Sequence, residues 1–216
     1  MSRRSFLLDL KAEGALALWH DYRRGDARDM SGNANHGTPS TTVVFSRDGA
    51  SFPATSSVIT VPDAASLRLT ALTMGVWGNF KNFIDLDRLI SKRSAGSVGY
   101  EFYFRTATLL AVADNGAVQR TIAATPKGAN ALALSALNGS TPEAFVDGIS
   151  IGSFSGTTTL AGASTADLLV GNQYTTVYRC KDYIGAVVLV NRVLTATEHA
   201  KLYGELANQD WGQRVL

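Results

Sequence analysis

Short stretches rich in β-branched and aromatic residues recur along the whole chain, and glycine or asparagine separates them at intervals of roughly 8–12 residues. Several stretches alternate apolar and polar residues, which is typical of a strand with one buried face. This regular succession of short strands and turns predicts an antiparallel sandwich or barrel. The predicted strands cover residues 41–45, 58–61, 72–80, 100–105, 108–112, 118–123, 131–137, 143–154, 167–171 and 183–190.

The clearest turn signal is Asp147-Gly148, inside the run 143–154. An Asp-Gly pair adopts the positive φ angles of a type I′ turn, so it predicts a tight hairpin between two strands. Only one segment favours a helix, and it begins at Thr195 and ends near Ala207. Thr195 and Glu198 have the spacing of a capping box, in which each side chain bonds an otherwise unpaired backbone amide.

The 216 residues contain no repeat, no low-complexity run and no linker, and therefore predict one all-β domain at 15–207. A short arm at 1–14 precedes it, and a short tail at 208–216 follows it. The arm is predicted as either a helix or a strand, because its pattern does not distinguish the two. Its apolar run is too short for the core of an export signal, so we expect no signal peptide.

Composition excludes several classes of protein. Twenty basic and eighteen acidic residues give a net charge of +2, without the basic stripe of a nucleic-acid binder. No apolar run approaches the length of a membrane span, so no membrane partner is expected. The single cysteine, Cys180, cannot form an intrachain disulfide.

The strongest motifs stand at the two ends of the predicted domain. Asp29-Met-Ser-Gly-Asn33-Ala-Asn35-His36-Gly37 follows an opening strand, the Val-Asp-Gly hairpin comes late, and Asn191-Arg-Val-Leu-Thr195 leads into Glu198. Together they resemble the laminin-G-like, concanavalin A-type jelly roll over about nine tenths of the chain. The resemblance implies two curved antiparallel sheets, termini close together, and a closing helix packed near the opening strand.

The segment that starts at Asp29 allows two interpretations. It is a structural turn, since Asp and Ser side chains bond backbone amides and Gly and Asn tolerate left-handed conformations. Alternatively, it is a calcium loop that uses Asp29, Asn33 and the Asn35 carbonyl. Calcium takes 6–8 oxygen ligands, so distant carboxylates would have to converge on it; the candidates are Asp21, Asp63 and Asp147.

Enzymes share this jelly roll, so glycoside hydrolysis has to be considered. It needs two carboxylates beside the scissile bond, and none of the five glutamates has the alternating pattern of the related glucanases. The nearest imitation is Asp85-Leu-Asp87, which we interpret as part of a solvated loop between strands. Histidine, serine and cysteine form no nucleophile motif. A non-enzymatic protein without a cofactor is therefore expected, with calcium as the one candidate.

Aromatic residues in loops suggest carbohydrate binding, because sugars stack on aromatic rings beside a few polar groups. Tyr174 and Tyr178, in the loop 172–179, are the predicted glycan contacts. Trp19 and Trp77 lie inside strand patterns and are predicted to be core. Packing between subunits is the alternative role for the two tyrosines.

The arm carries the predicted partner contacts Arg3, Arg4, Phe6 and Leu7. Its apolar residues need a surface, either on their own sandwich or on a partner. The domain opens with Leu-Trp-x-Asp-Tyr-Arg-x-Gly at 18–25. Small stand-alone chains with this opening resemble virion proteins of tailed bacteriophages. That resemblance implies a structural protein assembled in the host cytoplasm, which self-associates, binds other virion proteins and contacts host-surface glycans. A carbohydrate-binding lectin module, with or without calcium, is the alternative function.

Overall fold

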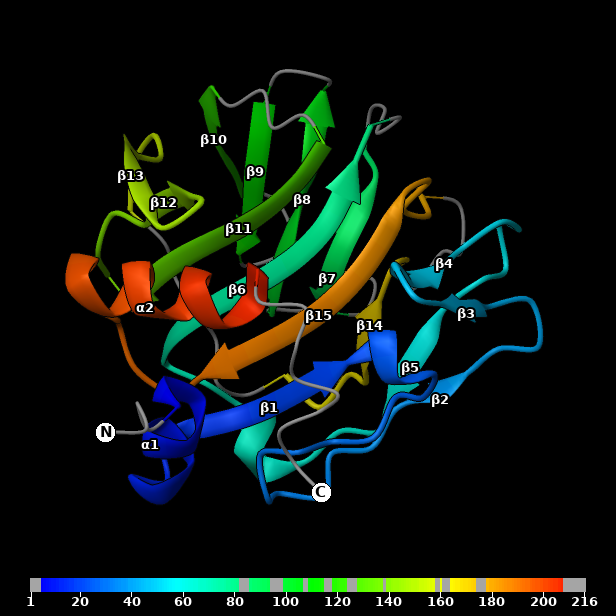
Figure 1. Ribbon diagram of the computed structural model, residues 1–216. Coiled ribbons are helices and arrows are strands. Elements are labelled where there is room, and N and C mark those ends of the chain that lie inside the picture. The colour runs from blue at the N-terminus through cyan, green and yellow to red at the C-terminus, as the bar shows by residue number, and fades with distance from the viewer. Residues whose placement is uncertain are drawn as a thin grey trace.

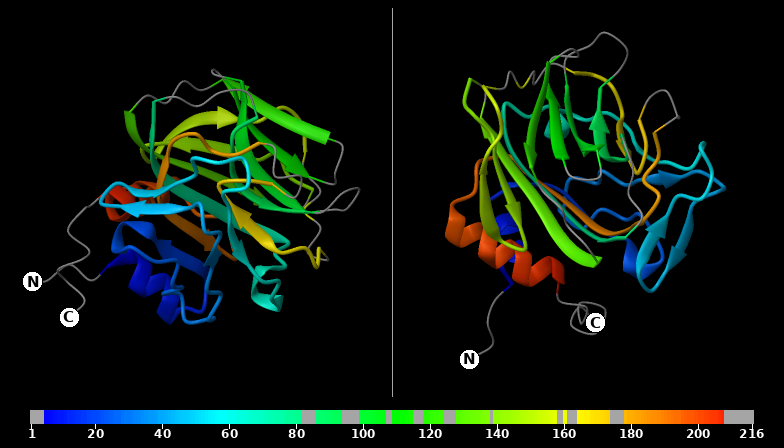
Figure 2. Two further views of the ribbon diagram at one scale, coloured as in Figure 1. Left: turned by 90° about the vertical axis from the view of Figure 1, so that its right-hand side faces the viewer. Right: turned by 90° about the horizontal axis from the view of Figure 1, so that it is seen from above.

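The computed structural model describes residues 5–81, 86–93, 99–106, 109–114, 118–123, 128–137, 139–157, 160, 164–173 and 178–207. Within these ranges, two antiparallel sheets pack face to face and two helices lie on the outside of one sheet (Figure 1, Figure 2). The predicted all-β sandwich with one closing helix is confirmed. None of the described helices has the length and apolar character needed to cross a membrane.

The first sheet contains eight described strands. Its order is β13 (Ile149–Ser153), β12 (Glu143–Val146), β11 (Gly128–Leu137), β6 (Ala71–Phe80), β15 (Tyr183–Val190), β4 (Gly49–Ser51) and β3 (Val44–Ser46), and β1 (Leu16–Asp21) also pairs with β15.

The second sheet contains seven described strands. Its order is β10 (Val118–Ala123), β9 (Leu109–Asp114), β8 (Tyr100–Thr106), β7 (Arg88–Lys92), β14 (Leu168–Val170), β5 (Ile59–Val61) and β2 (Thr38–Pro39). The strands β3 and β2 therefore form the edges of the two sheets on the same side of the sandwich (Figure 1).

Alternation along the central strands produces two separate apolar cores. The inner core lies between the two sheets, and the outer core lies between the first sheet and the two helices. In β6, Met74 and Val76 face the second sheet, while Gly75 and Trp77 face outward. Strand β15 is apolar on both faces because its outward residues are also covered, which explains the nearly continuous apolar run in its sequence. Trp19 and Trp77, each 5% exposed, belong to the outer core, as their strand positions predict.

Two helices cover the outer face of the first sheet. Helix α2 (Ala196–Ala207) begins at the predicted capping box, where the Thr195 amide donates to Glu198 Oε2 at 2.8 Å and the Glu198 amide donates to Thr195 Oγ1 at 3.3 Å. Its buried Leu202 approaches so closely that a Cβ on Gly75 would lie 3.1 Å from Leu202 Cδ2. A residue without a side chain at this position of β6 therefore lets the helix lie flat on the sheet.

The N-terminal arm contains the second helix, α1 (Phe6–Ala12). Leu7 and Leu10 are buried in the outer core, so the arm packs on its own sandwich. Ser5 Oγ donates to Glu205 Oε2 at 2.8 Å, and the Phe6 amide donates to Glu205 Oε1 at 3.1 Å. These bonds hold the start of the described chain against its final helix, in agreement with the implied proximity of the termini.

The hairpin between β12 and β13 turns at Asp147 and Gly148, with φ angles of 52° and 78°. Both angles are positive, as the Asp-Gly signal predicts. Three described strands fall outside the predicted set: β2, β4 and β7. The predicted strand at 41–45 forms only at its end, because β3 begins at Val44.

Candidate functional site

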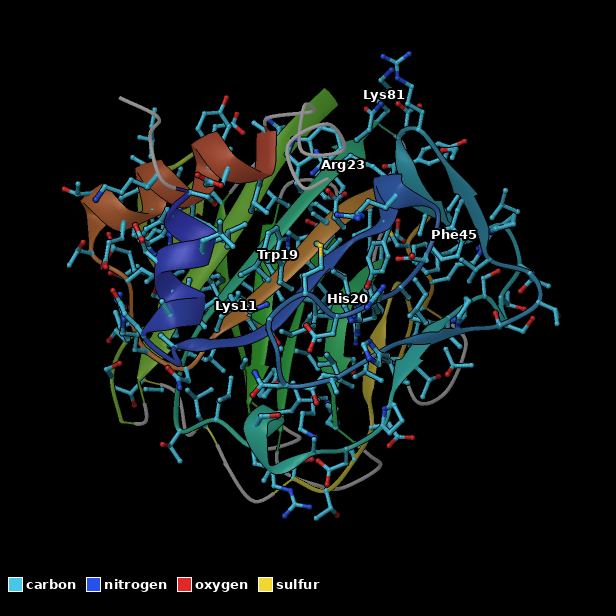
Figure 3. The ribbon with its side chains drawn as sticks, turned by 60° about the horizontal axis from the view of Figure 1, so that its bottom comes forward. Lys11, Trp19, His20, Arg23, Phe45 and Lys81 are labelled. Atoms are coloured by element: carbon cyan, nitrogen blue, oxygen red, sulfur yellow. The ribbon has the colours of Figure 1, made fainter. Side chains whose placement is uncertain are left out.

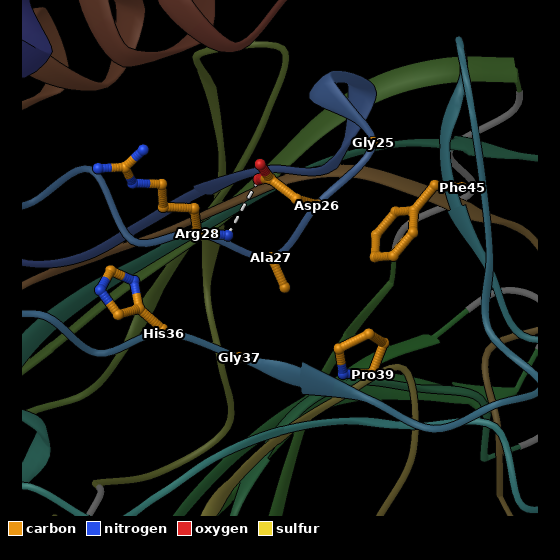
Figure 4. A pocket seen from close by; sticks show the side chains of 8 residues that line it. All are labelled: Gly25, Asp26, Ala27, Arg28, His36, Gly37, Pro39 and Phe45. Atoms are coloured by element: carbon orange, nitrogen blue, oxygen red, sulfur yellow. Dashed lines mark hydrogen bonds between the residues drawn. The ribbon is translucent and has the colours of Figure 1, made fainter.

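A pocket of about 530 Å³ opens where the edge strands β3 and β2 of the two sheets come together (Figure 4). Its walls come from the loop after the short 3-10 helix η1 (Tyr22–Arg24), from the segment that enters β2, and from β3. The lining residues are Gly25, Asp26, Ala27, Arg28, His36, Gly37, Pro39 and Phe45. Two of them, His36 and Gly37, end the motif that begins at Asp29.

The Asp29 carboxylate holds this wall of the pocket in place. Oδ1 accepts hydrogen bonds from the Trp19 amide at 3.0 Å and the Ser31 amide at 2.9 Å. Oδ2 accepts from Ser31 Oγ at 2.7 Å and the Asn35 amide at 2.9 Å. Four donors match the acceptor capacity of a carboxylate. Asp29 thus ties the loop 29–35 to strand β1.

Asn33 acts in the same loop as a donor. Its Nδ2 bonds the Leu16 carbonyl at 2.7 Å and the Ala17 carbonyl at 3.2 Å. These contacts, with those of Asp29, favour the structural-turn interpretation of the motif. Calcium binding by Asp29 and Asn33 stays a prediction, and an ion there would have to replace several of these hydrogen bonds.

The distant carboxylates considered as calcium ligands are each engaged elsewhere. Asp21 pairs with Arg23 at 2.7 Å, and Asp63 pairs with Lys92 at 2.6 Å. Asp147 accepts from the Ala131 amide at 2.9 Å. Within the described ranges, no three His, Cys, Asp or Glu side chains gather as a metal site would require.

His36 presents a defined donor to the pocket. The Asp29 amide donates to His36 Nδ1 at 3.0 Å, so Nδ1 is the unprotonated nitrogen and the neutral ring carries its proton on Nε2. Buried His20 of β1 (labelled in Figure 3) bonds the Asn35 carbonyl through Nε2 and the Tyr22 hydroxyl through Nδ1. Burial lowers the pKa of His20, which keeps that ring neutral.

The pocket combines apolar and polar surfaces. Phe45 and Pro39 form its apolar side, and the half-buried Phe45 ring rests against Tyr22 with the centroids 6.2 Å apart. On the other side, Asp26 Oδ1 accepts the Arg28 amide at 3.1 Å, and both side chains are exposed (Figure 4). A lining that combines an aromatic ring with a carboxylate, a guanidinium and an imidazole is the kind that holds a sugar.

The predicted glycan contact Tyr178 does not line this pocket. It is half-buried beside Arg88 at the start of β7, with its ring centroid 5.5 Å from Arg88 Cζ. Tyr174 lies outside the described residues. The structure therefore brings Tyr178 beside the second sheet and not into the pocket that His36 and Phe45 line.

The predicted partner contacts of the arm do not form one exposed surface among the described residues. Arg3 and Arg4 lie outside the described residues. Leu7 is 1% exposed and packs in the outer core, so its own chain already covers it. Phe6 is half-buried against that core, 5.7 Å from Lys201 Nζ. The sequence allowed two surfaces for the arm, its own sandwich or a partner, and Leu7 packs on its own sandwich.

The carboxylates considered for hydrolysis also differ from expectation. Asp87 is buried, at 2% exposure, so the interpretation as part of a solvated loop is wrong for it. Its neighbour Arg88 is also buried, at 5% exposure. Arg88 begins strand β7 directly opposite Tyr103 of β8. Glu101 lies two residues away on β8 and shares that face of the sheet, so Arg88 Nε lies 3.5 Å from Glu101 Oε1. Asp85 lies outside the described residues. Cys180 is fully buried, and burial raises the pKa of its thiol well above the usual range.

Sequence reasoning missed Asp26, Arg28, Pro39 and Phe45 as members of a site. Polar residues immediately before a rigid turn motif are one signal that could have found the first two. Phe45 carried no such signal, because the prediction placed it inside a strand, and its role depends on the meeting of two sheet edges.

Comparison with known proteins agrees with the sandwich. Domain 4 of the arabinanase AbnA from Geobacillus stearothermophilus, in complex with arabinotriose, superposes with a TM-score of 0.63 at 16% identity over 90% of this chain and 98% of that one. The binding domain of Paraclostridial Mosquitocidal Protein 1 gives 0.66 at 15% identity over 92% and 53%. Trypanosoma rangeli sialidase with sialic acid gives 0.61 at 14% identity over 91% and 34%.

The chain thus spans about half of the toxin binding domain and a third of the sialidase. At these identities the likeness concerns the fold alone. No curated protein matches the sequence significantly. The family model described as the concanavalin A-like lectin/glucanases superfamily matches residues 53–198. Since that match covers more than half of the chain, the protein belongs to the concanavalin A-like lectin/glucanase superfamily.

Proposed function

We propose that this protein is a non-enzymatic carbohydrate-binding domain, and that the pocket between Phe45 and Arg28 holds the sugar. The observation that carries the proposal is the composition of that pocket: an aromatic ring and a proline share its lining with exposed Asp26 and Arg28 and with the His36 donor. Sugars bind through stacking on one face and hydrogen bonds at the edges, which this arrangement offers.

The rigidity of the turn that carries His36 supports the same proposal. Asp29 fixes the turn that carries His36, so the donor is held before the ligand arrives. A preorganised site loses less conformational entropy on binding. The arabinotriose and sialic acid complexes of similar folds add a family-level analogy, although fold does not determine function.

The single carboxylate in the lining of the pocket favours binding over hydrolysis. Of the residues that line it, only Asp26 carries a carboxylate. Both retaining and inverting glycosidases need a pair. The described pocket therefore lacks the second group of that mechanism.

The test is a glycan-array screen of the purified protein, run with calcium and again with EDTA, followed by titration of the best ligand. We expect saturable binding that Phe45→Ala weakens by about tenfold, since an aromatic face contributes on the order of 1–2 kcal/mol. Val44→Ala is the matched control, because Val44 is 54% exposed on the same strand and does not line the pocket. Equal loss in both variants, or no sugar binding at all, would contradict the proposal.

A structural role in a tailed-phage virion, assembled in the host cytoplasm, is the second candidate. It is supported by the edge strand β13, where Ile149 and Ile151 are 72% and 36% exposed. An exposed apolar edge strand is a template for association with another chain. Light scattering after size exclusion is expected to show self-association that Ile149→Ser reduces and the distant Val193→Ser does not. A monomeric wild-type protein would remove self-association from this candidate.

A further inference from the structure

A second polar cluster lies on the face of the second sheet, apart from the pocket. Arg88 of β7 is opposite Tyr103 of β8 in the register, and Arg88 Cζ lies 3.7 Å from the centre of the tyrosine ring. Arg88 Nε donates to Gln173 Oε1 at 3.0 Å, and Nη1 donates to the Leu86 carbonyl at 3.1 Å. In the described part of the chain, nothing accepts from Nη2.

Glu101 is the acidic member of this cluster and is fully buried. It accepts Ser91 Oγ at 2.6 Å and Arg93 Nη1 at 3.0 Å, and its Oε1 lies 3.5 Å from Arg88 Nε. Arg88, Arg93 and Arg105 all act on Tyr103, together with Glu101. Three guanidinium groups around one hydroxyl are donors suited to a carboxylate.

The Tyr103 hydroxyl is a buried donor whose lack of a hydrogen bond needs an explanation. The side chain is fully buried, yet its oxygen has no hydrogen-bond partner among the described residues. Burial raises the pKa of Tyr103 to about 12, so the hydroxyl remains a donor at neutral pH. Folded proteins rarely leave a buried donor unpaired without a ligand or another functional reason.

The same cluster has an edge that reaches solvent. Arg93 keeps 14% of its side chain exposed, and Tyr178 is half-buried beside Arg88. A ligand that entered here would meet the Tyr178 ring, then the guanidinium of Arg88 and the Tyr103 hydroxyl. Gln173 Oε1 and the Glu101 oxygens would face its hydroxyl groups as acceptors.

We propose that Arg88, Arg93, Glu101, Tyr103, Gln173 and Tyr178 form a second binding site, for the carboxylate of an acidic sugar. Arginine recognises a carboxylate by paired N–H donors, and the Tyr103 hydroxyl supplies a further donor. Hydroxyl groups on the same sugar ring meet Gln173 and Glu101. This site is independent of the pocket around Phe45, and shares with it only the general class of ligand.

The test titrates the full chain by calorimetry with galacturonate, its methyl ester, galactose and acetate. Galacturonate is expected to bind, while the ester and galactose, which lack the charge, and acetate, which lacks the ring, bind at least about tenfold more weakly. Equal binding of the neutral sugars would overturn the role of the carboxylate. Equal binding of acetate would overturn the role of the ring, and absence of galacturonate binding would overturn the whole proposal.

Two tyrosines of β8 give matched variants. Tyr103→Phe removes only the unpaired hydroxyl, so it should weaken galacturonate binding by about tenfold and leave the urea midpoint unchanged. Tyr100→Phe removes a hydroxyl that donates to the Leu67 carbonyl at 3.1 Å, so it should lower the midpoint and leave binding unchanged. If Tyr103→Phe lowers the midpoint but not the affinity, the cluster is only structural. The best neutral ligand from the glycan array should not compete with galacturonate, which separates this test from that of the pocket around Phe45.

Discussion

His199 of α2 stacks on Phe145 of β12, with the ring centroids 3.5 Å apart and the planes 11° from parallel. On the sheet side, His199 Nε2 lies 2.8 Å from Ser135 Oγ of β11. One imidazole thus joins the closing helix to two strands of the first sheet. Its side chain is 1% exposed, and Nδ1 has no partner among the described residues, so a second proton would have no acceptor.

Acidification should therefore loosen the closing helix. Burial lowers the pKa of His199 to about 4, against about 6.5 in an unfolded chain. Between these values the unfolded chain binds the extra proton, so the free energy of unfolding falls as pH decreases from about 6.5 to about 4. The loss attributable to this residue is on the order of 3 kcal/mol.

Urea unfolding between pH 7.5 and 4.5 checks this, with His199→Gln as the comparison. The variant should start from a lower stability but lose less of it over that range. His20 contributes in the same direction, since burial also lowers its pKa, so the informative quantity is the difference in slope between the two proteins. Glu198, with a pKa lowered to about 2 by Arg192, acts only at lower pH. Identical slopes would show that His199 does not titrate as its burial requires.

Asp29→Asn should destabilise the fold. An amide has one acceptor oxygen and would turn its NH₂ group toward two of the four donors that the carboxylate satisfies. We expect a loss of about 3 kcal/mol in the free energy of unfolding, measured in urea. Asp26→Asn is the control, because exposed Asp26 accepts one amide bond. Repeating the series with calcium tests the ion prediction: stabilisation of the wild type alone would favour it.

Gly75→Ala should disturb the packing of α2 on the first sheet. The new methyl carbon would lie 3.1 Å from Leu202 Cδ2 and 3.3 Å from Leu206 Cδ1, so these two side chains or the helix that carries them have to shift. Overpacking of this kind costs about 1–3 kcal/mol. Gly204→Ala, within the same helix and with nothing within 4 Å, should instead stabilise the protein by about 0.5–1 kcal/mol. Thermal unfolding of both variants compares the two effects, and a neutral Gly75→Ala would contradict the close packing.

The arm should behave as part of the fold. Leu7→Ala removes a side chain that is 1% exposed in the outer core, so it should cost about 3 kcal/mol in the free energy of unfolding. Leu8→Ala, one residue later and 43% exposed, should be nearly neutral. Equal effects in chemical denaturation would mean that the arm does not pack as described.

The sequence predicted those parts of the fold in which the side-chain pattern matches the environment. Alternating β6, the Asp147-Gly148 hairpin and the Thr195 capping box all follow local rules, and the structure confirms them. Strand β7 was missed because Arg88 and Lys92 look solvated in the sequence. In the structure Lys92 is fully buried, with Nζ 2.6 Å from both Asp63 Oδ1 and the Ala166 carbonyl.

The candidate sites were harder to predict, since they depend on contacts between distant segments. The turn at Asp29 could be predicted from its own residues, whereas the pocket that Pro39 of β2 and Phe45 of β3 both line requires the edges of both sheets to be in place. Likewise, Tyr178 was predicted as a ligand contact, but its neighbour Arg88 comes from a strand that the pattern did not reveal.

The pairing of β1 has a consequence for how the molecule is made. Among the described strands, β1 pairs only with β15, with Leu16 opposite Val190 near the other end of the chain. During synthesis on a ribosome, β1 has no ladder partner until β15 has emerged. Contacts so distant in sequence slow folding, and until then the apolar residues of β1 can associate wrongly. Strand β15 also lies between β6 and β4, so the same late strand completes the first sheet and pairs β1.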